Sequence, residues 1–406
     1  MTKGKICFLV GSMAISGGTH VIVQHAAYLQ DHGFSVTLAV QEPFTDQTLA
    51  WHDLISRLRC IPIDAAKNEN FDLVVATWWK TALELHHFNA PRYAYFVQSV
   101  ESRFYPEAEK PLRTLIESTL RFPVAYVTEA TWIRQYLAKD YGHEVTLVRN
   151  GIRKDIYRLS GPAIKRRDPN KQPRVLVEGH FGVRFKNTAL GIRLAKEAGA
   201  KDIWVLTGSP VKWLPGVSRV FSQVPMNTTP KIYRSCDILV KLSTVEGMFG
   251  PPLEIFHCGG TAIVFDVTGH DEYIVDNHNA YVVSRHDIGG VVSALNRLLN
   301  YRNELERLKK GALSTANAWV SWDESSAAFL DWVEDVLAGP TTNRADVATL
   351  TYKAFSDYTR DEQQRLAQIS RYRFSAFASR IPPTLLRLIK QVEAPAEVIF
   401  CPRKAR

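Results

Sequence analysis

The feature of this sequence that most constrains its fold is a regular alternation of short apolar runs with longer amphipathic stretches. In the first part of the chain the apolar runs lie at residues 6–10, 35–40, 73–76, 93–97, 124–127 and 146–148. Each has the length and composition of a buried strand. The stretch 17–32 after the first run has helical spacing of its apolar residues, and Gly33 ends it. Strands that alternate with helices predict an α/β fold with a doubly wound parallel sheet.

A second set of the same signals follows a polar, basic and proline-containing interruption at residues 159–173. Further strands are expected at 174–177, 203–207, 238–241, 261–265 and 280–283, and helices at 188–198, 229–235, 252–258, 288–300 and 320–339. A chain of 406 residues is also longer than one hydrophobic core usually serves. We therefore predict four parts: Rossmann-like domains at 1–158 and 174–340, a linker at 159–173 and a helical extension at 341–406.

The extension is distinguished by its charge. Residues 341–406 carry twelve Lys and Arg against six Asp and Glu, and so hold most of the formal net charge of +9. Residues 345–392 have a helical pattern in which basic residues are interleaved with aromatic and aliphatic ones. Two interpretations stay open. The segment is either a helical cap packed on the body, or an element that binds an anionic membrane surface through residues 343–392.

Composition sets the class of protein. With 46% hydrophobic and 22% charged residues, the chain has the composition of an ordinary soluble globular protein. It has no apolar run near the roughly 20 residues that a membrane span needs, and its first apolar run is too short for a signal peptide. Its five cysteines are scattered, as expected for reduced thiols in the cytosol. We expect a cytoplasmic protein, peripheral on the inner face of the plasma membrane if the extension binds lipid.

The strongest chemical signal is a pair of glutamates, Glu246 and Glu254, separated by seven residues. Pro251-Pro252 lies between them, and because proline is favoured at a first helical position, a helix is predicted to begin there. The N–H groups of the preceding turn and of the helix start would form an anion site suited to a diphosphate. Glu254 has two acceptor oxygens, which suit the hydroxyls of a ribose. The turn residues assigned to this site are Gly247, Met248, Phe249 and Gly250.

The string 246–260 resembles the E-x7-E signature of glycosyltransferase family 4, including the Cys-Gly after the helix. The resemblance to the broad family spans roughly residues 5–335. It implies the GT-B fold, in which two Rossmann-like domains face each other across a cleft. The first domain would then bind an acceptor and the second a nucleotide sugar, with Glu246 beside the transferred sugar and Glu254 on the nucleotide ribose. The implied reaction is a retaining, metal-independent sugar transfer.

A second string, residues 177–187, supplies cations. In the family this strand ends in Gly-Arg and a lysine follows, and both cations are implied to bind the diphosphate and stabilise the leaving group. Lys186 stands at the lysine position, but His180 stands at the arginine position and Arg184 follows it. Either Arg184 or a protonated His180 is expected to replace the arginine. The candidate catalytic residues are therefore Glu246, Lys186, Arg184 and His180.

A third signal, Gly17-Gly18-Thr19, follows the first strand. These residues do not form G-x-G-x-x-G, so a dinucleotide site is not predicted. In the resembled family this loop lies beneath the donor sugar and the acceptor, where close backbone approach requires glycine. We assign Gly17, Gly18 and Thr19 to donor binding, against the alternative of a simple tight turn.

The residues predicted to bind the acceptor lie in the first domain. Segments 77–82 and 96–106 resemble the branch of the family that contains bacterial rhamnan and S-layer-glycan rhamnosyltransferases. Their aromatic side chains are suited to stack on sugar faces, although each taken alone fits a core position better than a ligand contact. Their polar side chains follow a buried strand at its carboxyl end, where α/β sheets bind ligands. The predicted residues are Gln98, Glu101, Trp78, Trp79, Phe104 and Tyr105.

The resulting prediction is transfer of a sugar, with L-rhamnose from dTDP-rhamnose as the first choice, to a hydroxyl of a growing, lipid-linked bacterial surface glycan. No metal or other cofactor is expected, because the sequence has no D-x-D motif. No nucleic acid is expected, because no recognisable binding module is present. Three alternatives stay open. One is a GT-B enzyme of another reaction, such as a sugar-nucleotide epimerase or a phosphorylase. The others are a donor-binding but non-catalytic partner subunit and a membrane-docked adaptor of a glycan-assembly complex.

Overall fold

The computed structural model describes residues 2–378, with side chains described as far as Arg371. The first domain is built on a seven-stranded, all-parallel sheet of strand order β3-β2-β1-β4-β5-β6-β7. Its strands are β1 (Lys5–Val10), β2 (Ser35–Val40), β3 (Arg59–Pro62), β4 (Leu73–Ala76), β5 (Tyr93–Val97), β6 (Ala125–Thr128) and β7 (Val145–Leu147). Alternate residues of β1 enter different cores, Ile6 and Phe8 on one face of the sheet, Cys7 and Leu9 on the other. Such a sheet is buried on both faces by helices.

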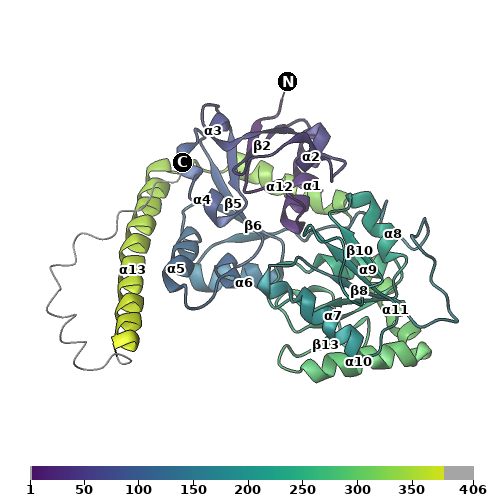
Figure 1. The fold of residues 1–406 in the computed structure, drawn as a ribbon. Helices are drawn as coiled ribbons and strands as arrows, with labels where there is room; N and C mark the ends of the chain where they lie inside the picture. The colour runs from purple at the N-terminus through teal and green to yellow at the C-terminus, as the bar shows by residue number, and fades with distance from the viewer. Residues whose placement is uncertain (1, 379–406) are drawn as a thin grey trace.

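The second domain repeats this plan with a six-stranded parallel sheet of order β10-β9-β8-β11-β12-β13. Its strands are β8 (Val175–Glu178), β9 (Ile203–Thr207), β10 (Arg219–Ser222), β11 (Ile238–Lys241), β12 (Thr261–Phe265) and β13 (Ala280–Val283). Two separate apolar cores lie on the two faces of this sheet. Figure 1 shows the two sheets as separate units along the chain.

Helices cover both sheets (Figure 1). Those of the first domain are α1 (Gly17–Asp31), α2 (Asp46–Leu49), α3 (Ile63–Ala66), α4 (Trp79–Ala82), α5 (Lys110–Thr119) and α6 (Thr131–Tyr141). Those that follow are α7 (Thr188–Glu197), α8 (Thr229–Tyr233), α9 (Gly250–His257), α10 (Ile288–Asn300), α11 (Arg302–Ala318), α12 (Trp322–Ala338) and α13 (Arg344–Ala378). The predicted fold class, two Rossmann-like domains with a helical extension, is confirmed.

The chain passes between the domains at two points that lie side by side. At the first crossing, Ile152 forms an isolated parallel bridge with Ser321, which lies at the second crossing. Gly151 has no room for a side chain, because a β-carbon there would overlap the backbone of Ser321. The second crossing leads into α12, which packs on α1 and places Trp322 and Phe329 in the core that holds β1. The predicted domain 174–340 therefore includes a helix that packs on the other domain.

The extension begins with α13, a 35-residue helix that lies along α5 of the first domain (Figure 1). Val347 and Ala354 are buried in the contact, so this part of the segment is a helical cap. Residues 379–392 of the predicted membrane element lie outside the described residues. Among the residues that the structure does describe, no helix is long and apolar enough to cross a membrane.

Candidate functional site

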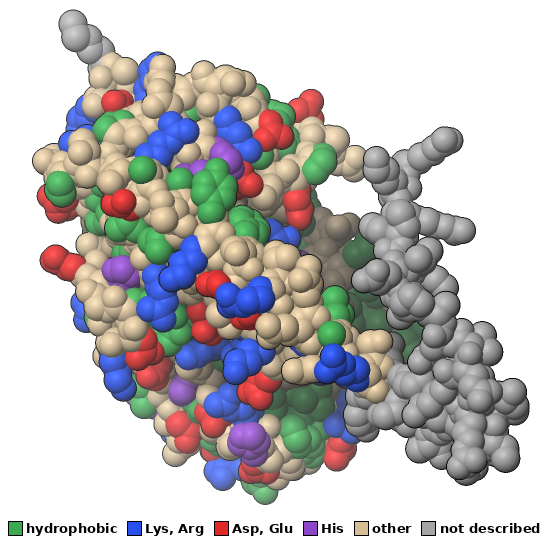
Figure 2. Space-filling model, turned by 90° about the vertical axis from the view of Figure 1, so that its left-hand side faces the viewer, with side chains coloured by type: hydrophobic (Ala, Val, Ile, Leu, Met, Phe, Trp, Pro, Cys, Tyr) green, Lys and Arg blue, Asp and Glu red, His purple; other side chains and the backbone are tan. Residues whose placement is uncertain are grey.

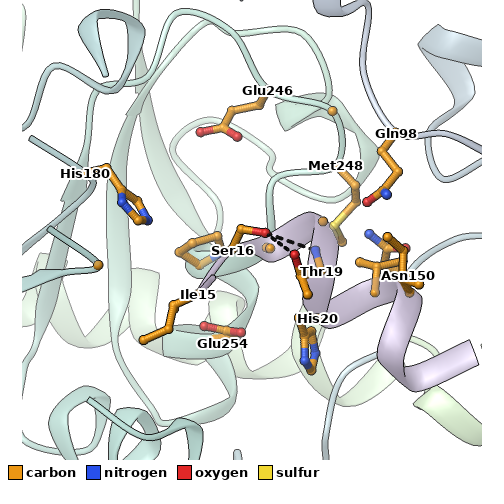
Figure 3. A pocket seen from close by; sticks show the side chains of 18 of the residues that line it. Ile15, Ser16, Thr19, His20, Gln98, Asn150, His180, Glu246, Met248 and Glu254 are labelled. Atoms are coloured by element: carbon orange, nitrogen blue, oxygen red, sulfur yellow. Dashed lines mark hydrogen bonds between the residues drawn. The ribbon is translucent and has the colours of Figure 1, made fainter. Parts of the chain in front are cut away.

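A cavity of about 590 Å³ lies between the carboxyl ends of the two sheets and is lined by residues of both domains. Open α/β sheets bind ligands at this edge, beyond the ends of their strands. In Figure 3, His180, Glu246 and Glu254 from the second domain surround the N-terminal end of α1 from the first. The cavity is therefore the candidate site.

Glu246 lies in the loop that joins β11 to α9, and it lines the cavity. As predicted, Pro251-Pro252 stands in the first turn of α9. The Oε1 atom of Glu246 is 2.7 Å from Nζ of Lys186 and 3.7 Å from Nζ of Lys241. Burial alone would raise the pKa of Glu246, but the two ammonium groups outweigh it and hold the pKa below its usual value. Glu246 is therefore a buried, ionised carboxylate.

Lys241 ends β11 and has a side chain only 2% exposed. Its ammonium contacts the carboxylate of Glu178, the last residue of the neighbouring strand β8. Burial would lower the pKa of Lys241, but Glu178 and Glu246 together raise it. Glu178, Lys241, Glu246 and Lys186 thus form one chain of alternating charges across the floor of the cavity, which we call the ion-pair chain.

Glu254 also lines the cavity, on α9. Burial raises the pKa of Glu254 to about 7, a hydrogen bond from Tyr233 opposes the shift, and the charge of Glu178 adds to it. The two glutamates of the motif therefore lie in one cavity but differ in ionisation, because only Glu246 lies beside two lysines.

The loop after Glu246 contacts the first domain directly. A β-carbon on Gly247 would overlap the carbonyl oxygen of Gln98, so only glycine fits there. The N–H of Met248 donates to Oε1 of Glu129 at 3.0 Å, and Nε1 of Trp132 donates to the carbonyl of Gly247 at 3.0 Å. The two domains are thus in direct contact through the loop 247–250.

Of the predicted cations, Lys186 and His180 line the cavity, whereas Arg184 does not. Arg184 is exposed on a short 3-10 helix, η4 (Arg184–Lys186). His180 packs against Gly208, and burial lowers its pKa, so the ring is neutral near pH 7. In this conformation neither residue places a charge where the family's arginine is expected.

Gly17, Gly18 and Thr19 begin α1 and line the cavity. Ser16 caps the helix, and its Oγ accepts the N–H of Thr19 at 3.0 Å (Figure 3). A β-carbon on Gly18 would lie 3.0 Å from Oε1 of Gln98, an atom that is buried and has no hydrogen-bond partner among the described residues. The close approach of this turn to Gln98 therefore favours a glycine.

The predicted acceptor residues separate into two groups. Gln98, Glu101, Trp78 and Phe104 line the cavity, whereas Trp79 and Tyr105 do not and pack edge to face within the first domain. Phe104 stacks on Phe185 of the second domain, with ring centroids 5.0 Å apart. The predicted donor residue Phe249 is also fully buried behind the loop. Gly247, Met248 and Gly250 line the cavity as predicted.

Glu101 is held by the fold. Its Oε2 accepts the N–H of Trp79 at 2.7 Å, at the start of α4, and the hydroxyl of Tyr95 at 3.4 Å. Burial raises the pKa of Glu101 to about 8. The carboxyl group is therefore neutral near pH 7, and its described bonds position Trp79 rather than a ligand.

The sequence interpretation missed Lys241, Glu178 and Glu129, although all three lie at or just after strand ends, where a search of carboxyl ends would have found them. It also missed His20, which lines the cavity. Nδ1 of His20 lies 2.9 Å from Nε2 of His52, so one of these two ring nitrogens donates a hydrogen bond to the other.

Within the described part of the chain, no group of three or more His, Cys, Asp or Glu side chains is arranged to hold a metal ion. The predicted absence of a metal in the reaction stays a prediction.

Comparison with known proteins places this geometry in context. Residues 214–315, which contain the Glu246–Glu254 loop, match the family model described as "Glycosyl transferases group 1". No curated protein has a matching sequence. The match covers one part of the second domain.

Solved structures resemble nearly the whole described chain. Sucrose-phosphate synthase from Thermosynechococcus elongatus is similar with a TM-score of 0.64 and 15% identity, over 83% of this chain and 100% of that one. HepE from Anabaena in complex with UDP-glucose has a TM-score of 0.65 and 13% identity, over 82% and 100%. WaaG, a glycosyltransferase involved in lipopolysaccharide biosynthesis, has a TM-score of 0.60 and 14% identity, over 80% and 99%. These similarities show the GT-B fold and, together with the group 1 match, support a glycosyltransferase.

Proposed function

We propose that this protein is a retaining, metal-independent glycosyltransferase that moves a sugar from a nucleotide donor to a glycan. The observation that carries the proposal is the placement of Glu246, Glu254 and Lys186 in one cavity between the two domains, with the start of α9 and the Gly17-Gly18 turn facing it. Anionic ligands bind at such helix starts.

The residues present supply the chemistry of a substitution with retention. Lys186 is partly exposed and can neutralise a departing diphosphate, together with N–H groups of the loop 247–250. The acceptor hydroxyl attacks from the face that the diphosphate leaves and passes its proton to the departing phosphate oxygen. Glu246 accepts hydrogen bonds from hydroxyls of the transferred sugar, and Glu254 accepts those of the ribose. No protein nucleophile is assigned.

For the donor we propose dTDP-L-rhamnose, and for the acceptor a growing, lipid-linked bacterial surface glycan at the cytoplasmic face of the plasma membrane. The support is the resemblance of segments 77–82 and 96–106 to the rhamnosyltransferase branch. The binding of UDP-glucose by the structural neighbour HepE makes uridine donors the first competitor to test.

We also propose peripheral attachment to an anionic membrane through residues 343–392. On α13 the apolar side chains of Tyr352, Phe355, Leu366 and Ile369 are exposed. On the face shown in Figure 2, Lys and Arg alternate with Asp and Glu rather than forming one block. The extension, in which Lys and Arg outnumber Asp and Glu, would therefore differ in charge from this mixed surface.

A second candidate function, a donor-binding partner subunit without turnover, is favoured by one observation, the neutral His180 at the position of the family's arginine. Nucleotide-sugar binding with no release of nucleoside diphosphate, in the presence of every acceptor tested, would identify it.

The test is a thermal-shift panel of nucleotide sugars, including dTDP-L-rhamnose and UDP-glucose, with EDTA present. A ligand at 100 times its Kd stabilises the folded protein by about 2.7 kcal/mol, a shift that is readily measured. We expect a shift with one donor that is insensitive to EDTA, lost in Glu254→Ala and kept in the exposed control Glu197→Ala. No shift with any nucleotide sugar would contradict the proposed function.

A further inference from the structure

The buried lysine of the ion-pair chain has a role that the E-x7-E signature does not assign. Lys241 is 2% exposed at the end of a central strand. A buried ammonium is costly unless it is paired, and both of its partners, Glu178 and Glu246, line the cavity. Lys241 is therefore held inside the site by acidic groups of the site itself.

The two lysines beside Glu246 differ in freedom. Lys186 lies on η4 and its side chain is 20% exposed, so it can turn toward a ligand. Lys241 is fixed by its strand, by the contact with Glu178 and by the ring of Phe249, whose centroid is 5.8 Å from Nζ. A diphosphate beside Lys241 would also face the carboxylate of Glu178, whereas beside Lys186 it would compete only with Glu246.

Donor binding would therefore change the charges around Glu246. When Lys186 turns to the diphosphate, Glu246 loses its nearer cation, and a buried carboxylate without a cation is strongly disfavoured. Among the other cations that line the cavity, Arg153 is already bound by Asp53 and Asp155. Only Lys241 is then left, among the described residues, to hold Glu246 in place.

We propose that Lys241, anchored by Glu178, is a positioning residue that keeps Glu246 ionised and directed at the donor sugar while Lys186 serves the diphosphate. This inference rests on the proposed function. The two lysines then serve different parts of the donor. Lys186 acts on the diphosphate, and Lys241 acts through Glu246 on the sugar.

The experiment compares binding of dTDP with dTDP-L-rhamnose, and of UDP with UDP-glucose, by calorimetry. The variants are Lys241→Met and the double variant with Glu178→Gln, which removes both charges and so leaves no unpaired buried glutamate. The matched control is Lys309→Met. Lys309 is a poorly exposed lysine of the same domain that pairs with buried Asp237 and does not line the cavity.

We expect both Lys241 variants to bind the nucleotide sugar about tenfold more weakly, the scale of a lost charge-assisted interaction. Affinity for the nucleoside diphosphate should stay within about threefold of wild type, because Lys186 is intact. The control should bind both ligands as wild type does. If the single variant fails to fold, the double variant carries the test. Weaker binding of the nucleotide sugar, with unchanged binding of the nucleoside diphosphate, would then support the proposal.

The pH dependence separates positioning from simple packing. The charged groups around Glu246 are Lys186 on η4, Lys241 on β11, Glu129 after β6 and Glu178 on β8, with Tyr273 also nearby. Removing one of the two cations should raise the pKa of Glu246, so affinity for the nucleotide sugar should be lost at a higher pH than in wild type as the solution is acidified.

Two results would overturn the proposal while leaving the proposed function intact. Equal weakening of both ligands would make Lys241 a phosphate ligand, and unchanged affinities with an unchanged pH profile would make it structural. If wild-type protein binds neither nucleotide nor nucleotide sugar, the proposed function itself fails, and this inference fails with it.

Discussion

At the scale of single residues, the pKa values of the carboxyl groups around the cavity are shifted in opposite directions. Burial raises the pKa of Glu101 to about 8 and that of Glu129 to about 7, whereas the lysines beside Glu246 lower its pKa. Glu129 accepts a hydrogen bond from the loop 247–250, and Glu101 accepts one from the start of α4. These two carboxyl groups maintain the shape of the site, and Glu246 lines the cavity beside its two lysines.

Glu101→Gln tests this distinction through stability. The folded-state pKa of about 8 lies above the reference value of 4.5, so wild-type stability falls as pH rises from 4.5 through 8. Glutamine can accept the bonds of Trp79 and Tyr95 on one oxygen and cannot ionise. We expect similar Tm values for variant and wild type at pH 5. At pH 9 the variant should be more stable by a few kcal/mol.

The measurement is differential scanning fluorimetry across this pH range, with exposed Glu197→Gln as the control, whose Tm difference from wild type should not change with pH. A Glu101→Gln variant less stable than wild type at pH 9 would mean that the carboxylate is ionised and paired in the folded protein.

Residues with a recognisable spacing were predicted from the sequence, and isolated ones were not. Glu246, Glu254 and Lys186 belong to strings with fixed separations, and all three line the cavity. Lys241 and Glu178 have no such spacing, since they are adjacent only because β8 and β11 pair across the sheet. Trp78 and Trp79 are neighbours in sequence, yet only tertiary packing decides that Trp78 lines the cavity and Trp79 enters the core.

Among the elements, the loop between β11 and α9 has the tightest fit to the opposite domain. The Cα of Gly247 faces the carbonyl of Gln98 with no room for a methyl group. Gly247→Ala should therefore keep both domains folded but hold the cavity open. We expect kcat/KM to fall by about 100-fold, because small misplacements of reacting groups have effects of this size.

Transfer rate and radius of gyration in solution would check this, with Gly289→Ala as the control. Gly289 lies in α10, where a β-carbon meets only Asp287 at 3.7 Å. Undiminished activity and an unchanged radius for Gly247→Ala would show that the loop yields and that closure does not depend on this contact.

The central strands of both sheets were predictable, and the edge strands were predictable only in part. The apolar runs 146–148 and 280–283 correspond to the edge strands β7 and β13, whereas the other edge strands, β3 and β10, were not predicted because their half-exposed sequences contain no continuous apolar run. The helix α12 was predicted from its pattern. Its packing on α1 could not be, because its apolar face would fit either domain.

At the scale of the whole molecule, two adjacent crossings join two domains, and α12 and α13 both return to the first one. The fold and the cavity between the sheets followed from the sequence pattern. The contacts that join the two domains across the cavity did not, since pairs such as Glu129 with Met248 are encoded by no pattern. The first domain thus carries both the predicted acceptor residues and the extension, so a membrane contact there would place a lipid-linked acceptor at the cavity.

The proposed membrane attachment can be tested by removing charge from the extension. A shortened variant that ends at Ala378 loses more basic than acidic residues. It loses two acidic residues and six basic ones, which are Arg380, Arg387, Lys390, Arg403, Lys404 and Arg406. We expect the full chain to bind phosphatidylglycerol vesicles, and the shorter chain to bind about tenfold or more weakly, because each basic residue near an anionic surface contributes about 1 kcal/mol. Exposed Leu366 and Ile369, changed together to Ser, should weaken binding further without disturbing the core.

Vesicle sedimentation at low and high salt measures both contributions, with phosphatidylcholine vesicles as the control. Binding through charge should be lost as salt rises, because exposed charges are screened within about 10 Å at 0.1 M, whereas the Leu366 and Ile369 contribution should persist. Equal binding by full and shortened chains, or binding by neither, would leave α13 as a helical cap on α5 alone. The lipid-linked acceptor would then have to reach the cavity without help from the extension.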